Sequence, residues 1–174
     1  MKKALVVVDY QKDFVDGALG SADALALEDP LYRRVAEALD GSEAVFFTMD
    51  THGPDYNGTN EGRHIPVPHC IKGTEGWRIF GKLEELSRKA EIFCKDTFGS
   101  IALAERLSEG GFDRIELCGV ATNICVAVNA ALIRSFLPEA DIIIDPKLVA
   151  SYDRGLGEAA LNVMGSFCID IKNE

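Results

Sequence analysis

The sequence lacks the features that would place this chain in a membrane, in a secretory pathway or on a nucleic acid. The apolar run near its start covers only residues 4–8, whereas a secretory signal needs about 7–15 apolar residues and a membrane span about 18. Lys and Arg number 18 against 28 acidic residues, the formal net charge is −10, and no Lys/Arg cluster offsets it. We therefore expect a cytoplasmic protein that binds neither nucleic acid nor a membrane.

Paired cysteines are also missing, which argues against a disulfide-stapled fold. The five cysteines are an odd number, and they are scattered along the chain without a CxxC pair. In a reducing compartment this pattern is not that of a disulfide framework. Four of the five are therefore expected to be small buried hydrophobic residues.

What the sequence does contain is the composition of an ordinary globular protein. Hydrophobic residues make up 47% and charged residues 26% of its 174 positions. This length fits one domain, residues 1–174, which can bury roughly 70% of the surface that its unfolded chain would expose. No internal repeat, low-complexity tract or linker interrupts the chain.

Six short runs rich in β-branched and aliphatic residues predict strands, and amphipathic segments lie between them. The predicted strands are residues 5–9, 44–49, 91–95, 114–119, 141–145 and 167–171. Strands that alternate with helices imply βαβ units with right-handed crossovers. We therefore predict an α/β fold, a doubly wound and mostly parallel sheet.

Capping residues indicate where four of the helices begin and end. The predicted starts are Asp29 before Pro30, then Ser100, then Thr122, then Ser151 or Asp153, and the last three helices end at Gly110-Gly111, near Leu137 and at Gly165.

Reactive side chains gather at the predicted strand ends. In doubly wound sheets, ligands bind beyond the carboxyl ends of the strands, where the strand order reverses. Asp9 and Lys95 end two strands, Asp50 and His52 follow a third, and the loop after a fourth leads to Cys125. Four of the six predicted strand ends thus carry candidate chemistry, which predicts an active site at this edge of the sheet.

Cys125 is a candidate nucleophile. It lies three residues after Thr122, so in the first turn of the predicted helix its thiolate would be favoured by the unpaired N–H groups and the helix dipole, which lower a thiol pKa. The same N–H groups would hold an oxyanion. The alternative is a core cysteine on a helix face, next to Val126 and Val128.

Asp9 and Lys95 are candidate partners of this cysteine. A carboxylate at the end of a buried strand needs a cation or a proton, although a helix cap or a loop hydrogen-bond acceptor is an equal alternative for Asp9. For Lys95 the alternative is a snorkelling surface lysine. Together with a cysteine the pair has a clear use, because the carboxylate can move the thiol proton to a leaving amine while the ammonium holds the carboxylate.

All three histidines, His52, His64 and His69, fall within residues 49–76, a segment without regular periodicity. Asp50 and His52 lie two residues apart at a strand end. Imidazole and carboxylate ligands suit Zn²⁺, Mn²⁺ or Fe²⁺. Ordinary polar contacts within the loop are the alternative.

Three segments of this chain resemble the motifs of isochorismatase-like cysteine hydrolases, in the same order along the sequence. Asp9-Tyr-Gln-Lys-Asp-Phe14 is similar to their opening motif, Lys95-Asp-Thr-Phe98 to their lysine segment, and Gly119-Val-Ala-Thr-Asn-Ile-Cys-Val126 to their nucleophile motif. The resemblance implies a six-stranded parallel sheet with helices on both faces and a catalytic triad of Asp9, Lys95 and Cys125, with a thioester at the cysteine. It also implies a cis peptide at Val120-Ala121 that directs the N–H groups of Ala121 and Cys125 toward the substrate carbonyl.

A further resemblance concerns the loop that holds the histidines. Asp50-Thr-His52, Glu61-Gly62 and the segment from Pro68 to Gly76 are similar to the metal segment of nicotinamidases. Many members have a histidine where this chain has Tyr56, and some bacterial members use a glutamate from the loop instead. The resemblance therefore implies a divalent metal, zinc with manganese or iron as alternatives, held by Asp50, His52, Glu61 and His69. His64 is a less favoured substitute for Glu61.

The same resemblance implies the activity. In nicotinamidases the metal binds the pyridine nitrogen and orients the ring, around which Phe14, Trp77 and Phe98 would pack here; ordinary core packing is the alternative for each. Cofactor-free relatives, including hydrolases of carbamoyl groups, generally lack the metal segment, and isochorismatases lack the nucleophilic cysteine. The expected function is hydrolysis of nicotinamide to nicotinate and ammonia, by a chain that forms a homo-oligomer as the family usually does. The alternatives are hydrolysis of another small amide or ureido compound, or a non-catalytic module that binds a small molecule or metal.

Overall fold

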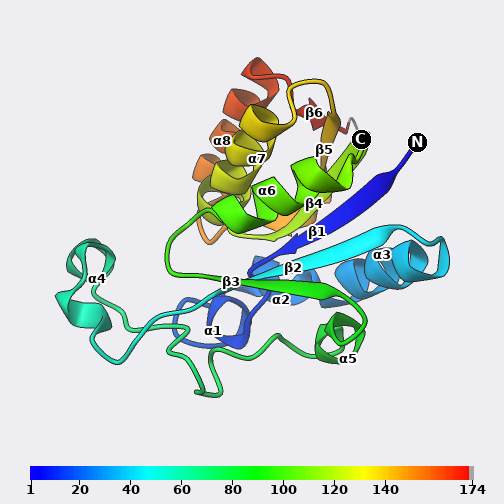
Figure 1. The fold of residues 1–174 in the computed structure, drawn as a ribbon. Helices are drawn as coiled ribbons and strands as arrows, with labels where there is room; N and C mark the ends of the chain where they lie inside the picture. The colour runs from blue at the N-terminus through cyan, green and yellow to red at the C-terminus, as the bar shows by residue number, and fades with distance from the viewer. Residues whose placement is uncertain (173–174) are drawn as a thin grey trace.

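The fold is built on a central parallel sheet, shown in Figure 1, whose inner strands are nearly continuous apolar runs. The computed structural model describes residues 1–172. In β1, residues 4–8 are all buried, as expected of a parallel strand that is covered on both faces. The strands are β1 (Lys3–Val8), β2 (Ala44–Asp50), β3 (Glu91–Lys95), β4 (Arg114–Val120), β5 (Asp141–Ala150) and β6 (Asp170–Ile171).

The strand order β3-β2-β1-β4-β5-β6 confirms the predicted doubly wound sheet, and all five pairings between neighbouring strands in the described chain are parallel. Strands β2 and β3 lie on one side of β1, and β4, β5 and β6 lie on the other, so the strand order reverses between β1 and β4. The carboxyl ends of these two strands are therefore the expected ligand site. The two strands approach closely there. Gly119 has φ +107° and pairs with Val8, and a Cβ on Gly119 would lie 2.2 Å from the Val8 carbonyl oxygen, so only glycine fits.

Helices cover both faces of the sheet, as predicted. The helices are α1 (Lys12–Val15), α2 (Ala22–Ala26), α3 (Glu28–Asp40), α4 (Asn60–His64), α5 (Leu83–Ser87), α6 (Ile101–Gly110), α7 (Ala127–Phe136) and α8 (Arg154–Ser166), with a 3₁₀ turn η1 (Tyr56–Gly58) and a π-helical turn η2 (Thr122–Val126). One apolar cluster joins α6, α7 and α8 to the sheet, and a second joins α1, α2, α3 and α5 to the opposite face. Helix α4 lies apart from both layers, beyond the carboxyl ends of β1 and β2 (Figure 1).

Two of the predicted helix starts agree with the structure. Ser100 Oγ accepts a hydrogen bond from the Leu103 N–H, and Asp153, rather than Ser151, caps α8 by accepting from the Leu156 N–H. Gly111, with φ +62°, ends α6 as a left-handed cap.

Other predicted boundaries are wrong. Helix α3 begins at Glu28 after Leu27, not after Asp29. The predicted helix does begin at Thr122, as the π-helical turn η2 that leads into α7, but its N-cap residue is Ala121 rather than Thr122. The last strand is only Asp170–Ile171, because Phe167 is the C-cap residue of α8 and the N–H groups of Cys168 and Ile169 still donate to carbonyls of that helix. Within residues 1–172, no helix combines the length and the apolar character that crossing a membrane requires.

Candidate active site

Three ionisable side chains meet beyond the carboxyl ends of the central strands. Asp9 follows β1 with φ +45°, Lys95 is the last residue of β3, and Cys125 lies in η2 after β4. Lys95 Nζ lies 2.6 Å from Asp9 Oδ2 and 3.7 Å from Cys125 Sγ. Lys95 is not a snorkelling surface residue, because its side chain is only 3% exposed. The structure therefore brings together the three residues that the sequence suggested as a triad.

Asp9 is a fully buried carboxylate with a strong affinity for a proton. Thr48 Oγ1 donates a hydrogen bond of 2.6 Å to Asp9 Oδ1. Burial raises the pKa of Asp9 above its ordinary value; the Lys95 ammonium opposes this rise, and the charge of Asp50 adds to it. Asp9 is thus a stronger base than an exposed aspartate, as a group that accepts a thiol proton needs to be.

The expectation of a lowered pKa at Cys125 is wrong. Burial raises the pKa of the Cys125 thiol well above its usual range, the neighbouring Asp9 carboxylate raises it further, and Lys95 acts in the opposite direction. The helix N-terminus does not reverse this outcome, because the thiol is enclosed by protein and its charged form loses its hydration. Cys125 therefore holds its proton more strongly than an exposed cysteine does, and a neighbouring base would assist its attack.

The turn that carries Cys125 has a distinctive backbone. The peptide bond between Val120 and Ala121 is cis, and both residues line the same cavity as Cys125. The Val126 N–H donates to the Ala121 carbonyl at 3.2 Å, which makes the turn π-helical. Turns of this kind are frequent at functional sites, and this one forms part of the cavity wall together with Cys125.

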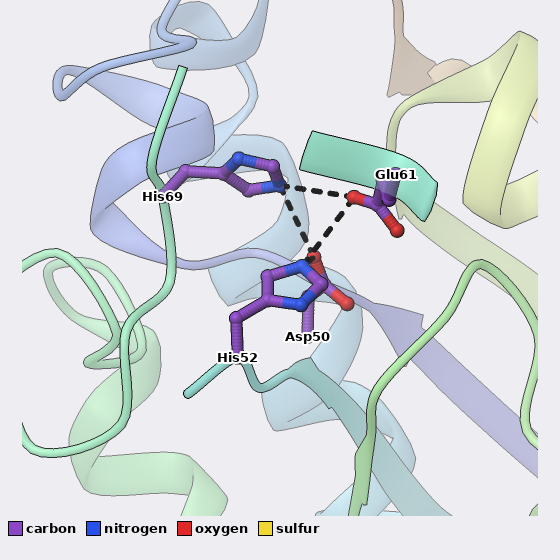
Figure 2. Close-up of side chains that lie close together, drawn as sticks. All are labelled: Asp50, His52, Glu61 and His69. Atoms are coloured by element: carbon purple, nitrogen blue, oxygen red, sulfur yellow. Dashed lines mark hydrogen bonds and ion pairs between the residues drawn. The ribbon is translucent and has the colours of Figure 1, made fainter. Parts of the chain in front are cut away.

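Four further side chains form a compact cluster next to the triad. Figure 2 shows Asp50, His52, Glu61 and His69 directed toward one point. His52 Nε2 lies 2.9 Å from Asp50 Oδ2 and 3.4 Å from Glu61 Oε1, and His69 Nε2 lies 3.4 Å and 3.5 Å from the same two oxygens. One ligand atom from each residue lies within 4.8 Å of all the others.

The chemistry of this cluster fits a divalent metal. Two imidazole nitrogens and two carboxylate oxygens are a ligand set that suits zinc, manganese or iron. The His69 Nδ1 atom lies 2.8 Å from the Val67 carbonyl, the kind of contact that orients a ligand histidine. Burial raises the pKa of Glu61, and the charge of Asp50 adds to the rise. A cation between Glu61 and Asp50 would neutralise both carboxylates.

His64 does not join the cluster. It is exposed at the end of α4, where its Nδ1 atom lies 2.9 Å from the Asn60 carbonyl. The buried ring of Tyr56 instead packs against the two clustered histidines, with ring centroids 4.7 Å from His52 and 5.0 Å from His69. An aromatic wall thus stands where many of the resembled sequences have another histidine.

Asp50 connects the cluster to the triad, and Gln11 fixes its backbone. Asp50 Oδ2 faces the two histidines, while Oδ1 lies 3.3 Å from Lys95 Nζ. The fully buried Gln11 accepts a hydrogen bond of 2.7 Å from the Asp50 N–H and donates one of 2.8 Å to the Asp50 carbonyl. Sequence reasoning missed this role, although an amide side chain two positions after Asp9, close to the end of an apolar strand, was a signal.

A cavity lies beside Cys125 and the cluster. Cys125, Asp50, Glu61 and His69 all line it, and the other lining side chains are mostly apolar. Phe14 and Phe98 belong to its wall, and their contact with a substrate ring stays a prediction.

Trp77, by contrast, is not among the residues that line this cavity. Its indole packs against the second apolar cluster, and its Nε1–H donates to Thr51 Oγ1 at 2.9 Å. The prediction that Trp77 contacts the substrate ring is therefore wrong, and ordinary packing explains this residue.

Comparison with known proteins finds similar sequences and structures over nearly the whole chain. A model of the isochorismatase domain matches residues 3–172. A nicotinamidase/pyrazinamidase of Mycobacterium tuberculosis is 29% identical, over 74% of this chain and 76% of that protein. The crystal structure of nicotinamidase/pyrazinamidase PncA from Bacillus subtilis superposes with a TM-score of 0.88 at 30% identity, covering 99% of this chain and all of that one. A pyrazinamidase of Pyrococcus horikoshii in complex with zinc gives a TM-score of 0.86 at 26% identity, with full coverage of both chains.

Proposed function

The chain belongs to the isochorismatase family and is a hydrolase of amide carbon–nitrogen bonds, and on this premise we propose that it hydrolyses nicotinamide to nicotinate and ammonia. One observation carries the proposal. The sulfur of Cys125 and three members of the metal-fitting cluster, Asp50, Glu61 and His69, line a single cavity. A planar substrate with a carboxamide at one side and a ring nitrogen at the other can occupy both ends of such a cavity at once.

In the proposed reaction, Cys125 is the nucleophile and Asp9 is the base. Asp9 takes the proton from Sγ as the sulfur attacks the amide carbon, so a thiol becomes a nucleophile without resting as a thiolate. The Lys95 ammonium, 2.6 Å from Asp9 and 3.7 Å from the sulfur, stabilises negative charge on either group during this transfer. The N–H groups of Ala121 and Cys125 hold the oxygen that becomes negative in the tetrahedral intermediate.

Collapse of this intermediate breaks the carbon–nitrogen bond. Asp9 returns its proton to the leaving nitrogen, which departs as ammonia, and Cys125 retains the acyl group as a thioester. A water molecule then attacks the thioester carbon while Asp9 accepts its proton. The thiolate of Cys125 leaves and recovers that proton, and the carboxylic acid is released.

Substrate orientation is the proposed role of the cluster and of the two phenylalanines. Asp50, His52, Glu61 and His69 would hold the metal, for which we propose zinc, and the bound cation would supply a Lewis acid that fixes the ring nitrogen. Phe14 and Phe98 would pack against the faces or edges of the ring. His69 packs against Phe14 with ring centroids 5.3 Å apart, so the proposed metal ligand and the ring wall are in direct contact.

Ammonia release tests the proposal. Purified protein would be incubated with nicotinamide, pyrazinamide, benzamide and a set of ureido compounds, with Cys125→Ala as the control for contaminating activity. We expect turnover of nicotinamide and pyrazinamide, much weaker turnover of benzamide, which has no ring nitrogen, and none with the variant. Preference for a ureido compound would replace the proposed substrate. Turnover that survives Cys125→Ala would show that Cys125 is not the nucleophile.

A further inference from the structure

Asn129 is a fully buried amide that neither the proposed triad nor the metal-fitting cluster uses. It lies on α7, one turn after Cys125, and its side chain is completely enclosed. A buried amide costs stability unless its polar atoms are paired. The partners of Asn129 therefore indicate what the residue does.

The Asn129 side chain binds three backbone groups in two separate segments. Its Oδ1 atom accepts a hydrogen bond of 3.0 Å from the Ser100 N–H. Its Nδ2 atom donates one of 3.1 Å to the Phe98 carbonyl and one of 2.8 Å to the Cys125 carbonyl. One acceptor and two donors are needed at this point, and an asparagine amide supplies them from a single side chain, whereas a carboxylate or a hydroxyl does not.

The loop that Asn129 binds is part of the site. Residues 96–100 follow Lys95 directly, and Phe98 lines the cavity beside Cys125. The loop also lies tightly against α7. A Cβ added to Gly99 would come within 2.5 Å of Leu132 Cδ1 and 2.8 Å of Val128 Cγ1. Close packing at Gly99 and the amide of Asn129 thus hold the same stretch of backbone from two sides.

We infer that Asn129 is a positioning residue that fixes the Phe98 wall of the cavity against the turn that carries Cys125. The inference rests on the proposed function, because it takes Cys125 as the nucleophile and Phe98 as a contact of the substrate ring. Without the amide, the Phe98 carbonyl and the Ser100 N–H lose a buried partner and the loop must move to find another. The ring contact then moves relative to the sulfur, and a displacement of about 1 Å from productive geometry can cost on the order of 10²-fold in rate.

A double-mutant cycle between Asn129 and Phe98 tests this inference. Asn129→Leu removes the hydrogen bonds at similar volume, and Phe98→Ala removes the side chain that Asn129 is inferred to position. We expect Asn129→Leu alone to lower kcat/KM about 10- to 100-fold, largely through KM, and to lower it less than about threefold in the Phe98→Ala background. Ile133→Val serves as a control, because it loosens the packing of the same helix without removing any of the three hydrogen bonds of Asn129.

The inference is overturned if the two single effects multiply in the double variant, or if Ile133→Val reduces kcat/KM as much as Asn129→Leu does. Should Asn129→Leu not fold, Asn129→Asp gives the same cycle, since it keeps the acceptor for Ser100 and places an oxygen against two carbonyls. If the wild type hydrolyses no amide, the proposed function fails on its own. The cycle is then measured on the rate at which iodoacetamide, itself a small amide, alkylates Cys125, and the same coupling or its absence decides the inference.

Discussion

Replacing Asp9 by asparagine should make Cys125 react faster with iodoacetamide and should slow amide hydrolysis. The Asp9 carboxylate raises the pKa of Cys125, so its loss lowers that pKa and favours the thiolate at neutral pH. Lys95 Nζ, 3.7 Å from the sulfur, then lacks its nearest counter-charge, and at an effective dielectric constant of about 20 its attraction for a thiolate is on the order of 4 kcal/mol. Asp50, 3.3 Å from the same nitrogen, offsets part of this attraction. We therefore expect alkylation by iodoacetamide to become at least several-fold faster.

Amide hydrolysis in the same variant should fall, because no group remains to give a proton to the leaving nitrogen. General acid–base catalysis contributes roughly 10²- to 10⁴-fold, so a loss of at least about 10²-fold is expected. Mass mapping of Cys125 alkylation at a series of pH values measures the first reaction, and its pH curve should move to lower pH. Steady-state ammonia release measures amide hydrolysis. Asp141→Asn, an exposed aspartate at the start of β5, should leave both rates unchanged. Alkylation and hydrolysis that fall together would refute the reasoning and make Asp9 a structural residue.

Three further predictions concern the metal-fitting cluster. Glu61→Ala should weaken zinc retention about 10-fold or more, whereas His64→Ala should have little effect. Metal analysis of the purified variants measures this, and the reverse result would make His64 rather than Glu61 the metal ligand. Chelation should abolish nicotinamide hydrolysis while Cys125 is still alkylated at nearly its former rate, and parallel loss of both reactions would mean that the cluster maintains the nucleophile itself. Gln11→Leu should lower both zinc affinity and the unfolding temperature, because it leaves the backbone N–H and carbonyl of Asp50 buried without partners. Unchanged zinc affinity, measured by competition with a chelator, would limit Gln11 to a structural role.

Much of the sheet could be predicted from the sequence because periodicity and composition act locally. The apolar run 4–8 is typical of an inner strand, and Ser100 is a capping residue at the start of an apolar helix. The boundaries that were wrong depend on non-local contacts. Leu27 rather than Asp29 precedes α3 because the chain continues almost directly from α2 and Leu27 is buried in the second apolar cluster. Phe167 ends α8 instead of beginning a strand because its ring packs against the first apolar cluster, which joins α6, α7 and α8 to the sheet.

The candidate site also divides into features that follow from the strand topology and features that depend on packing in the folded protein. Strand ends place Asp9, Lys95 and Cys125 at one edge of the sheet, so their proximity followed from topology. The raised pKa of the Cys125 thiol did not follow, because it depends on how completely the folded protein encloses the sulfur. Trp77 was misplaced because nothing in the sequence distinguishes an aromatic ring that faces the cavity from one that packs beneath the loop.

The two oxygens of Asp50 have a consequence for protein engineering. One oxygen faces the histidines and the other faces Lys95, so under the proposed function this residue would contribute both to holding the metal and to the electrostatic environment of Cys125. A library that seeks a cation-independent hydrolase cannot treat position 50 as an ordinary ligand to be deleted. Variants there should be selected for a side chain that still contacts Lys95, with asparagine as the natural first choice. Glu61 and His69 make no contact with the triad lysine, and they are the positions at which cation dependence can be altered first.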